Sequence, residues 1–593
     1  MSNIKALLTE KPASKAFKVF LAIVLIAFSF ILIKSFKTEA QETRNVTTKV
    51  TIGNAAPAFT TGPAESPAST TTNPTTPGND VTFTATATDS NGQNYYLTVC
   101  SVAGITASTT GAGTCSGTDA KEYCHSSSTA SGSQASCAYT TLTSADAGYP
   151  DPYTNPWYAY VCDADGTAPS CSSAGQGTGD SGSPFIVNHA PSFTAISNDS
   201  PANPGESITW TATASDVDSN NLTLLVCKTN SMTNGACDGG AWCTSTPASS
   251  NPTCAYNVPA VAADGDNTAY VFVVDSHGTA ATGVAQGTQS NFTISNVAPV
   301  VSNVKLNNEG AITLVTKTVT NVPVTLTVED NNGCSTTEVT SVVAYVYRSG
   351  VGSTNCDAAG EHNTNYCYTA ISCTQDAGSC TTGASATYTC QVPMQYYADP
   401  TTTDTLFPTQ YWIATVTATD DDSATHTLSS TAQVDVNALL AFDVSDNTTT
   451  IVAEINYGSL GVGEIANTTT LPQRLYTIPA GNVGLDQKHH SVEANMCTNF
   501  PTCTGGTPIP IGQQHYALTA VAYSGGTALT STATEIELNV PKINAGTITN
   551  GSTWWGIQIP SATIPGTYTG QNTITSVMDE TTSRWGLPAG EAY

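Results

Sequence analysis

Short runs of alternating apolar and polar residues recur along most of the chain. In each run, residues such as Val, Phe, Ile, Trp or Leu alternate with Thr, so that one face of a strand is buried and the other is wet. The alternating runs occupy residues 81–87, 208–214 and 324–328. Later runs rich in aromatic and β-branched residues, each followed by an acidic turn, occupy residues 157–161, 269–273 and 411–416. The pattern predicts strands and turns, and the predicted fold class is all-β.

A recurring sequence motif marks the boundaries between repeats. An apolar run leads into an asparagine and then a proline at Asn54, Asn188 and Asn296, with a degenerate copy at Asn437. The copies lie about one β-sandwich apart, and the proline redirects the chain into the next unit. The predicted domains are an N-terminal segment at 1–48, Ig-like domains at 49–187, 188–295 and 296–436, and a C-terminal β-sandwich at 437–593.

The first residues differ from the remainder of the chain. Four lysines precede a mostly apolar run at 19–33, which predicts a hydrophobic helix. The run is long for the core of a signal peptide and short for a membrane span. Two interpretations therefore stay open, a membrane anchor or a leader cleaved after residues 38–40. In both, the lysines place the start of the chain in the cytoplasm and the domains outside.

The repeats resemble the Ig-like modules of bacterial and archaeal cell-surface proteins, including polycystic-kidney-disease-type and cadherin-like repeats. The resemblance covers residues 49–436 and implies tandem β-sandwiches that serve as spacers, adhesins or surface-layer units. The last segment has an apolar strand at 554–560, a Pro-Gly turn at 565–566 and a final Thr-rich strand. This ending is similar to the C-terminal hairpin of surface-layer and fibre-subunit sandwiches.

Cysteines follow the N-terminal segment in clusters of six, four, six and two, which predicts disulfides in an oxidising compartment. Cys162 and Cys171 are absent together from the second repeat, so we expect them to be bonded to each other. Cys497 and Cys503 are the two cysteines of the last domain and are expected to pair. The four cysteines shared by the first two repeats allow three pairings, and the six at 334–390 allow fifteen.

Charge narrows the choice of partners. The chain has 45 acidic and 17 basic residues and a net charge of −28, so its surface repels nucleic acid and anionic lipid headgroups. We expect no nucleic acid and no small-molecule substrate as partners, and membrane contact only through the N-terminal segment. Glycosylation sequons lie at Asn45, Asn198, Asn221, Asn291, Asn447, Asn467 and Asn550.

Two acidic turns carry candidate metal ligands. The candidate ligands are Asp216, Asp218, Asn220, Asp420, Asp421 and Asp422. Calcium takes six to eight oxygen ligands from carboxylates, carbonyls and water. The resemblance to cadherin-like modules implies calcium at domain junctions, where it stiffens the chain, and no other cofactor is expected. Because Asp-x-Asn spacing is also ordinary turn chemistry, a purely structural role stays open.

The sequence predicts no enzyme. Residues 179–184 resemble the nucleophile segment of trypsin-like proteases, but that chemistry needs a histidine base and a buried aspartate beside the serine. The histidine that precedes the segment outside the cell, His125, lacks the sequence context of that family. His489 and His490 show no ligand spacing and are expected in a solvated loop.

These features predict an extracellular cell-surface protein, anchored at its N-terminus or secreted. The first hypothesis is a subunit of a surface layer, sheath or appendage, whose partners are further copies of itself or other components of the cell envelope. The alternative is an adhesin that binds a partner through disulfide-bounded loops at 100–137 and 356–390. The third and weakest hypothesis is a hydrolase with a site in the last domain.

Overall fold

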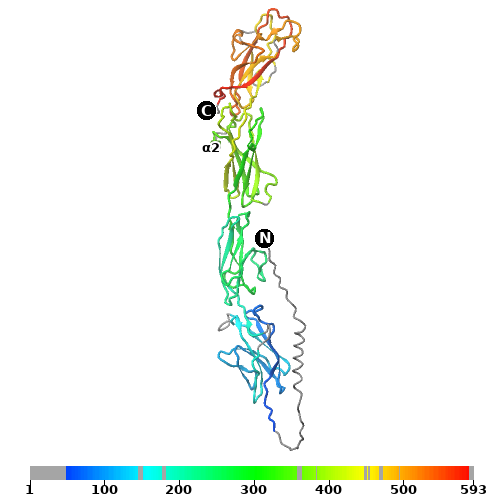
Figure 1. Ribbon diagram of the computed structural model, residues 1–593, viewed down its shortest axis with the longest axis vertical. Helices are drawn as coiled ribbons and strands as arrows, with labels where there is room; N and C mark the ends of the chain where they lie inside the picture. The colour runs from blue at the N-terminus through cyan, green and yellow to red at the C-terminus, as the bar shows by residue number, and fades with distance from the viewer. Residues whose placement is uncertain are drawn as a thin grey trace, which may run out of the picture. The chain divides into compact units, whose positions relative to one another are not determined.

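The computed structural model describes residues 49–143, 151–175, 182–356, 363–381, 383–446, 451, 454–466, 472–492 and 495–586. Nearly all regular elements in these ranges are β-strands (Figure 1), which confirms the predicted all-β class. The predicted N-terminal helix lies outside the described residues. Within the ranges above, no helix has the length and apolar character needed to cross a membrane.

Two compact units make up the chain. Of the described residues, the first unit comprises those within 49–68, 81–139 and 156–183, and the second comprises those within 69–80, 140–155 and 184–586. The first unit holds most of the first sandwich. The second unit holds three further sandwiches and a short pair of strands, β8 (Thr154–Asn155) and β10 (Phe185–Ile186).

The first sandwich packs one three-stranded sheet, β1-β2-β7, against another, β6-β3-β9. Its strands are β1 (Ala58–Glu65), β2 (Asp80–Thr88), β3 (Tyr95–Cys100), β6 (Glu122–His125), β7 (Gln134–Thr140) and β9 (Tyr158–Asp163), with a small hairpin of β4 (Ile105–Thr106) and β5 (Thr114–Cys115). The rings of Phe83 and Trp157 meet edge to face in the core, with centroids 5.2 Å apart. The buried indole N–H of Trp157 donates to Glu65 Oε1 at 2.7 Å, which satisfies that donor.

The second sandwich has a three-stranded sheet, β11-β12-β17, and a four-stranded sheet, β16-β13-β19-β20. Its strands are β11 (Ser192–Asn198), β12 (Ser207–Ser215), β13 (Leu222–Cys227), β14 (Met232–Thr233), β15 (Ala236–Cys237), β16 (Ala241–Thr244), β17 (Thr253–Asn257), β18 (Gly265–Asn267), β19 (Tyr270–Asp275), β20 (Thr288–Gln289) and β21 (Phe292–Ile294). In β12 the apolar residues alternate into the core, where Trp210 meets Phe292. Two antiparallel sheets face to face are the architecture of an Ig-like domain.

The third sandwich is built from one seven-stranded sheet, in the order β22-β23-β26-β25-β24-β27-β28. Its elements are β22 (Val300–Leu306), η3 (Asn307–Glu309), β23 (Thr320–Glu329), β24 (Val339–Arg348), α2 (Ser353–Cys356), β25 (Cys367–Gln375), β26 (Ser385–Met394), β27 (Trp412–Asp420) and β28 (Thr425–Ser429). Strand β25 pairs with both β24 and β26 and so joins the two halves. Much of segment 356–390, which was expected to be a binding loop, is therefore sheet, and that expectation was wrong.

The final sandwich pairs a five-stranded sheet, β29-β30-β37-β34-β35, with a three-stranded sheet, β36-β31-β38. Its elements are β29 (Phe442–Ser445), β30 (Gln473–Pro479), β31 (Leu485–Ser491), β32 (Asn495–Met496), β33 (Ile509–Pro510), η4 (Ile511–Gln513), β34 (Gln514–Ala517), η5 (Tyr523–Gly525), β35 (Thr527–Ala528), β36 (Thr534–Val540), β37 (Gly551–Ile557), β38 (Asn572–Met578) and η6 (Thr582–Arg584). His489 lies on β31 and is 1% exposed, so the prediction of a solvated loop there was wrong. The strand buries it because its ring stacks on Trp555 in the core.

All 18 cysteines form disulfides, and each disulfide joins two cysteines of the same sandwich. Cys162 is bonded to Cys171 and Cys497 to Cys503, the two pairs that the sequence predicts. The first two sandwiches share a pattern, in which Cys100–Cys115 and Cys124–Cys137 correspond to Cys227–Cys237 and Cys243–Cys254. The third sandwich has Cys334–Cys380, Cys356–Cys367 and Cys373–Cys390.

The pair Cys162–Cys171 is expected to be dispensable for the fold. In the second sandwich Val274 occupies the place of Cys162, since each is paired with the second residue of the facing strand. Replacing Cys162 with Val together with Cys171 with Ala should lower the stability of the first sandwich by about 2–3 kcal/mol, because the disulfide closes a short loop. Hydrogen exchange in β3 and β9 measures the loss. Complete exchange of both strands would contradict the prediction.

The third and final sandwiches share a buried junction. Asp399 lies between two cations, with Oδ2 3.1 Å from Arg348 Nε and Oδ1 2.6 Å from Lys542 Nζ. Asp399 and Lys542 are fully buried, and they come from different sandwiches. Two buried asparagines span the same junction. Asn365 donates to Ile543 O at 2.8 Å, and Asn482 donates to Ala398 O at 3.0 Å.

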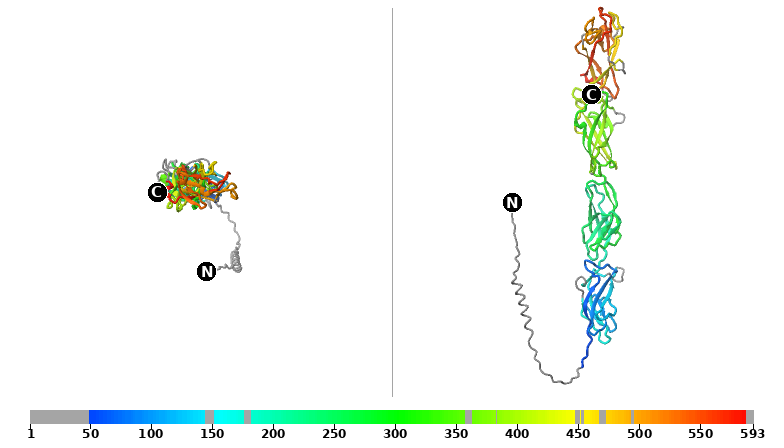
Figure 2. Two further views of the ribbon diagram at one scale, coloured as in Figure 1. Left: turned by 90° about the horizontal axis from the view of Figure 1, so that it is seen from above. Right: turned by 90° about the vertical axis from the view of Figure 1, so that its right-hand side faces the viewer.

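An apolar cluster completes this junction. Leu406 and Phe407 of the third sandwich pack against Val483 and Trp585 of the final one. The red end of the described chain, with η6, returns to the third sandwich (Figure 2), and the Trp585 indole donates to Asp579 O at 2.8 Å. In the segment after residue 577, which shows no clear pattern in the sequence, Met578 and Trp585 pack into this cluster.

Candidate metal centre at a sandwich junction

The boundary asparagine of each of the first three repeats makes the same kind of hydrogen bond, whereas Asn437 donates to Thr313 Oγ1 at 2.8 Å. In those three repeats its side-chain amide donates to Oδ2 of the aspartate that follows or ends the late strand, β9, β19 or β27. The pairs are Asn54–Asp163 at 2.8 Å, Asn188–Asp275 at 2.6 Å and Asn296–Asp420 at 3.0 Å. The repeated sequence motif is therefore a repeated structure, in which the asparagine ties the entry of a sandwich to its acidic turn.

A second aspartate in each sandwich lies in the turn after β2, β12 or β23. Its Oδ1 accepts the backbone N–H of the residue two places on, as in an Asx turn. The pairs are Asp89–Asn91 at 2.6 Å, Asp216–Asp218 at 2.7 Å and Asp330–Asn332 at 2.8 Å. That later residue in turn accepts the backbone N–H that follows the boundary asparagine, from Ala55 at 2.9 Å, His189 at 2.5 Å and Val297 at 2.7 Å.

This network leaves one carboxylate oxygen over in each copy. Oδ2 of Asp89, Asp216 and Asp330 has no hydrogen-bond partner among the described residues. A buried carboxylate oxygen without a donor is unfavourable, because the charge loses its hydration. The third copy is the most buried of the three, with Asp330 only 1% exposed.

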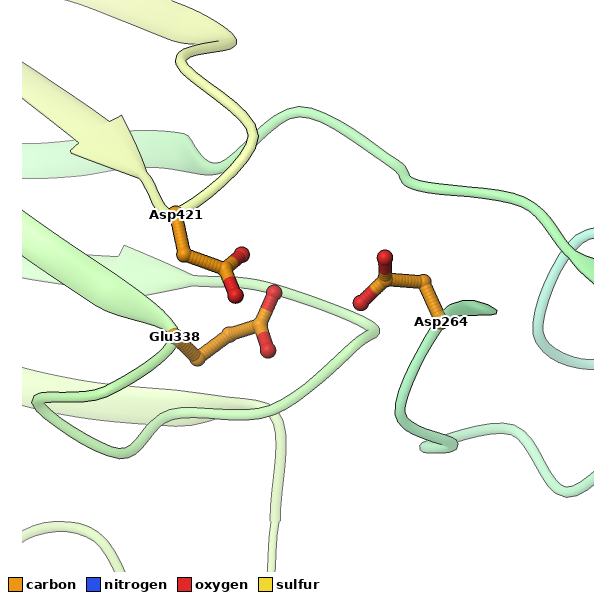
Figure 3. A group of neighbouring side chains, drawn as sticks. All are labelled: Asp264, Glu338 and Asp421. Carbon is orange, nitrogen blue, oxygen red and sulfur yellow. The ribbon is translucent and has the colours of Figure 1, made fainter. Parts of the chain in front are cut away.

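The third copy also gathers carboxylates from two sandwiches. Asp264, Glu338 and Asp421 each place an oxygen within 4.8 Å of the others. Figure 3 shows Glu338 and Asp421 side by side and Asp264 pointing toward them from a separate loop. Asp264 precedes β18 in the second sandwich, whereas Glu338 precedes β24 and Asp421 follows β27 in the third.

Backbone contacts hold the two loops together. The backbone N–H of Ala262, two residues before Asp264, donates to Asn331 O at 3.0 Å. The Asn332 side-chain amide donates to the carbonyl oxygens of Ala262 and Ser295, at 3.1 Å in each case. The same Asx turn that closes on Asp330 thus positions Asp264 in front of Glu338.

Glu338 is the most perturbed acid of this cluster. Burial, and then the negative charges of Asp421, Asp330 and Asp264, raise its pKa to about 7. Burial also raises the pKa of Asp330. Glu338 is 8% exposed, and its Oε1 has no hydrogen-bond partner within the described part of the chain. Several acids thus face one space that lacks a positive charge.

The three aspartates of the acidic run at 420–422 have different surroundings. Asp420 accepts hydrogen bonds at both oxygens, from Asn296 at 3.0 Å and from the Ala424 backbone at 2.7 Å. Asp421 is the member that faces Glu338. Asp422 lies beside Asp264, whose charge raises the pKa of Asp422. The run therefore supplies one member of the three-carboxylate group, and Asp420 serves the turn.

The other predicted turn is held by hydrogen bonds. Asp218 lies 2.9 Å from His189 Nδ1 and also accepts the His189 backbone N–H. Asn220 donates to the boundary residue Asn188, and its own backbone N–H donates to Asp216 at 3.2 Å. The described residues bring no third carboxylate into a group with Asp216 and Asp218.

Two residues of the cluster were missed from the sequence. Asp264 belongs to an Asp-Gly-Asp-Asn segment, whose spacing is the same signal that singled out Asp216 and Asp218. Glu338 is a lone glutamate after Cys334 and carries no local signal at all. A second group, Asp486, Asp579 and Glu580, lies in the final sandwich. No motif in the sequence singles out these three residues either. No family model and no curated protein matches the chain.

Solved structures of tandem Ig-like domains resemble the chain at low scores. The ectodomain of mouse nectin-like molecule 4 (Ig1–Ig3) is 9% identical, with a TM-score of 0.24, and the match covers 61% of this chain and 96% of that one. The N-terminal eight Ig domains of Down Syndrome Cell Adhesion Molecule are 9% identical, with a TM-score of 0.20 and coverage of 89% and 60%. A marsupial T cell receptor is 10% identical, with a TM-score of 0.20 and coverage of 60% and 97%.

Proposed function

We propose that the chain is an extracellular structural protein of the cell surface, a subunit of a surface layer, sheath or appendage. The observation that carries the proposal is the buried junction between the third and final sandwiches. Arg348, Asp399 and Lys542 form a charged group with almost no exposure, which is stable only while both sandwiches stay together. Such a junction suits a structural protein in which the third and final sandwiches keep a fixed arrangement.

Disulfides support an extracellular role for these domains. Every cysteine is oxidised, and disulfides persist in secreted and surface proteins but are rare in the cytosol. The low charge density and net charge of −28 suit an exposed and soluble surface. The exported location and the use of the N-terminal segment as an anchor or leader belong to the same proposal.

Self-assembly tests the structural role. Full-length protein, purified with and without millimolar calcium chloride, is expected to form regular sheets or filaments in negative-stain electron microscopy. Separate single molecules under every condition and at every concentration would contradict the proposal of a self-assembling subunit. The Asp404→Asn variant changes an exposed residue outside the buried junction, so it serves as a control that should assemble as the wild-type protein does.

An adhesin remains the second candidate, favoured by one observation. The first two sandwiches each carry a hairpin, β4–β5 and β14–β15, that a disulfide ties to the sandwich, and each also has a lysine above an aromatic ring. Lys121 Nζ lies 4.6 Å from the centroid of the Tyr139 ring, and Lys228 Nζ lies 4.6 Å from that of Trp242. Hairpins held rigidly on a scaffold are typical of recognition surfaces. Retention of cell binding after both hairpins are replaced by Gly-Ser turns would exclude this candidate.

A further inference from the structure

We propose that Asp264, Glu338 and Asp421 bind one Ca²⁺ ion that joins the second sandwich to the third. The three carboxylates come from both sandwiches and converge within 4.8 Å. Two oxygens bound to one Ca²⁺ lie up to about 5 Å apart, since each Ca–O bond is about 2.3–2.6 Å. The inference goes beyond the proposed structural function and holds whether or not the protein assembles.

An independent observation points to a ligand in this space. Glu338 is more than nine-tenths buried, with 8% exposure, and its Oε1 lacks a hydrogen-bond partner within the described ranges. Asp330, at 1% exposure, has an unpartnered Oδ2, and its charge acts on Glu338. Buried carboxylate oxygens are almost always satisfied by a donor or a metal.

Among the described residues, the cluster lacks an ion pair that would balance its charge. In the described part of the chain, no ion pair with Lys, Arg or His reaches Asp264, Glu338 or Asp421. The equivalent turn of the second sandwich differs, because His189 Nδ1 lies 2.9 Å from Asp218. In the third sandwich Val297 takes the place of His189, and the neutral Asn332 takes the place of Asp218.

The donor set selects the kind of cation. All three ligands are hard carboxylate oxygens, and nitrogen or sulfur ligands of the kind that favour zinc are absent from the group. Asp421 is exposed, which leaves room for the waters that complete six to eight ligands on Ca²⁺. Mg²⁺ is smaller and keeps most of its own waters, so it bridges two loops less well.

Calcium binding by the full-length protein and its variants tests the proposal. Equilibrium dialysis counts bound Ca²⁺ per chain, and hydrogen exchange reports on the peptides around residues 262–267 and 331–338. Wild-type protein is expected to bind with a Kd of about 10⁻⁴–10⁻³ M, the range of extracellular modules. Added CaCl₂ should slow exchange in both peptides, and MgCl₂ at the same concentration should not.

Variants from both sandwiches distinguish a bridging ion from a local one. Glu338→Gln in the third sandwich and Asp264→Asn in the second should each bind one Ca²⁺ fewer per chain, or bind it at least about tenfold more weakly. Asp421→Asn changes an exposed residue and gives the same result even if the buried Glu338 variant folds poorly. Glu309→Gln is the matched control, because Glu309 is exposed on the same sandwich and should leave binding unchanged.

Three outcomes would overturn the proposal. The first is a wild-type protein that binds no Ca²⁺ at 5 mM, about five to fifty times the expected Kd. The second is normal binding by both Asp264→Asn and Asp421→Asn, which would place any bound ion elsewhere, such as beside Asp486 and Asp579. The third is loss of binding in Glu338→Gln and Asp421→Asn but not in Asp264→Asn, because the ion would then belong to the third sandwich alone.

Discussion

Replacing Asp399 with asparagine is expected to destabilise the third and final sandwiches by about 3–5 kcal/mol. Asp399 is ion-paired with both Arg348 and Lys542 in this junction, and the side chain of Lys542 has no exposure. An asparagine fills the same volume but carries no charge. The buried ammonium of Lys542 would then lose the carboxylate that neutralises it, which is the condition under which broken buried ion pairs are most costly.

Hydrogen exchange of the full-length protein measures this effect in each sandwich separately, because a chain of several domains has no single unfolding transition. Faster exchange is expected in β24 and β27 and in β36 and β37, on both sides of the junction. Asp404→Asn makes the same chemical change at an exposed position five residues away and should alter exchange very little. Equal exchange in the two variants would show that the buried ion pair does not hold the sandwiches together.

A third variant, Lys542→Met, tests the other side of the ion pair. The change removes one cation but leaves Asp399 paired with Arg348, so it should destabilise the junction less than Asp399→Asn does. A larger effect of Lys542→Met would contradict this ranking, because methionine keeps an unbranched side chain of similar length and removes mainly the ammonium group that binds Asp399.

The final sandwich is expected to be sensitive to acid through His489. Burial lowers the pKa of His489 to about 4, below its ordinary value of 6.5. Its Nε2 lies 2.9 Å from Gln487 Oε1, whereas its Nδ1 has no partner among the described residues. A second proton on Nδ1 would therefore be buried without an acceptor, between the rings of Tyr516 and Trp555.

The direction of the pH effect follows from the two pKa values. Between about pH 6.5 and pH 4 the unfolded chain binds a proton at His489 and the folded chain does not, so stability is full above pH 6.5 and falls with the pH. The loss at His489 reaches about 3 kcal/mol near pH 4. Asp486 opposes it, because burial raises its folded pKa to about 6, and its contribution to stability declines as the pH rises from about 4 to 6.

A comparison of variants separates these two groups. His489→Gln keeps Asp486, so the difference between wild type and variant in the unfolding free energy of the final sandwich, measured by hydrogen exchange in β31, reports on His489 alone. That difference should shift by about 3 kcal/mol in favour of the variant between pH 7 and pH 4. His490→Gln makes the same replacement at the neighbouring position, whose side chain points to the other face of β31. A constant difference between wild type and His489→Gln over this range would refute the prediction.

Local patterns predict the strands well, because alternation reflects burial directly. The run 208–214 lies within β12, and its Ile208, Trp210 and Ala212 are buried as expected. The adjacent tryptophans of β37 also follow the rule, with Trp555 buried and Trp554 outside, where the Arg474 guanidinium lies 5.0 Å from the centroid of the Trp554 ring. Each of these features depends only on neighbours along one strand.

Features that depend on distant segments were not predictable in this way. Strand β25 joins the halves of the third sandwich through partners on two other strands, and its own Thr- and Ser-rich sequence resembles a loop. Glu338 and Asp264 meet across a gap of more than seventy positions along the chain. His489 has no apolar signature, and its burial is visible only once Trp555 is placed beside it.

The order of the paired cysteines along the chain has a consequence for how the disulfides form. In the first, second and final sandwiches every bond joins cysteines that follow one another along the chain, such as Cys100 to Cys115 and Cys227 to Cys237. An oxidase that joins thiols as they emerge would therefore make these bonds correctly. In the third sandwich Cys334–Cys380 crosses Cys373–Cys390, and pairing in order of emergence would give no native bond at all. This one sandwich ties the maturation of the chain to thiol–disulfide exchange after its first bonds form.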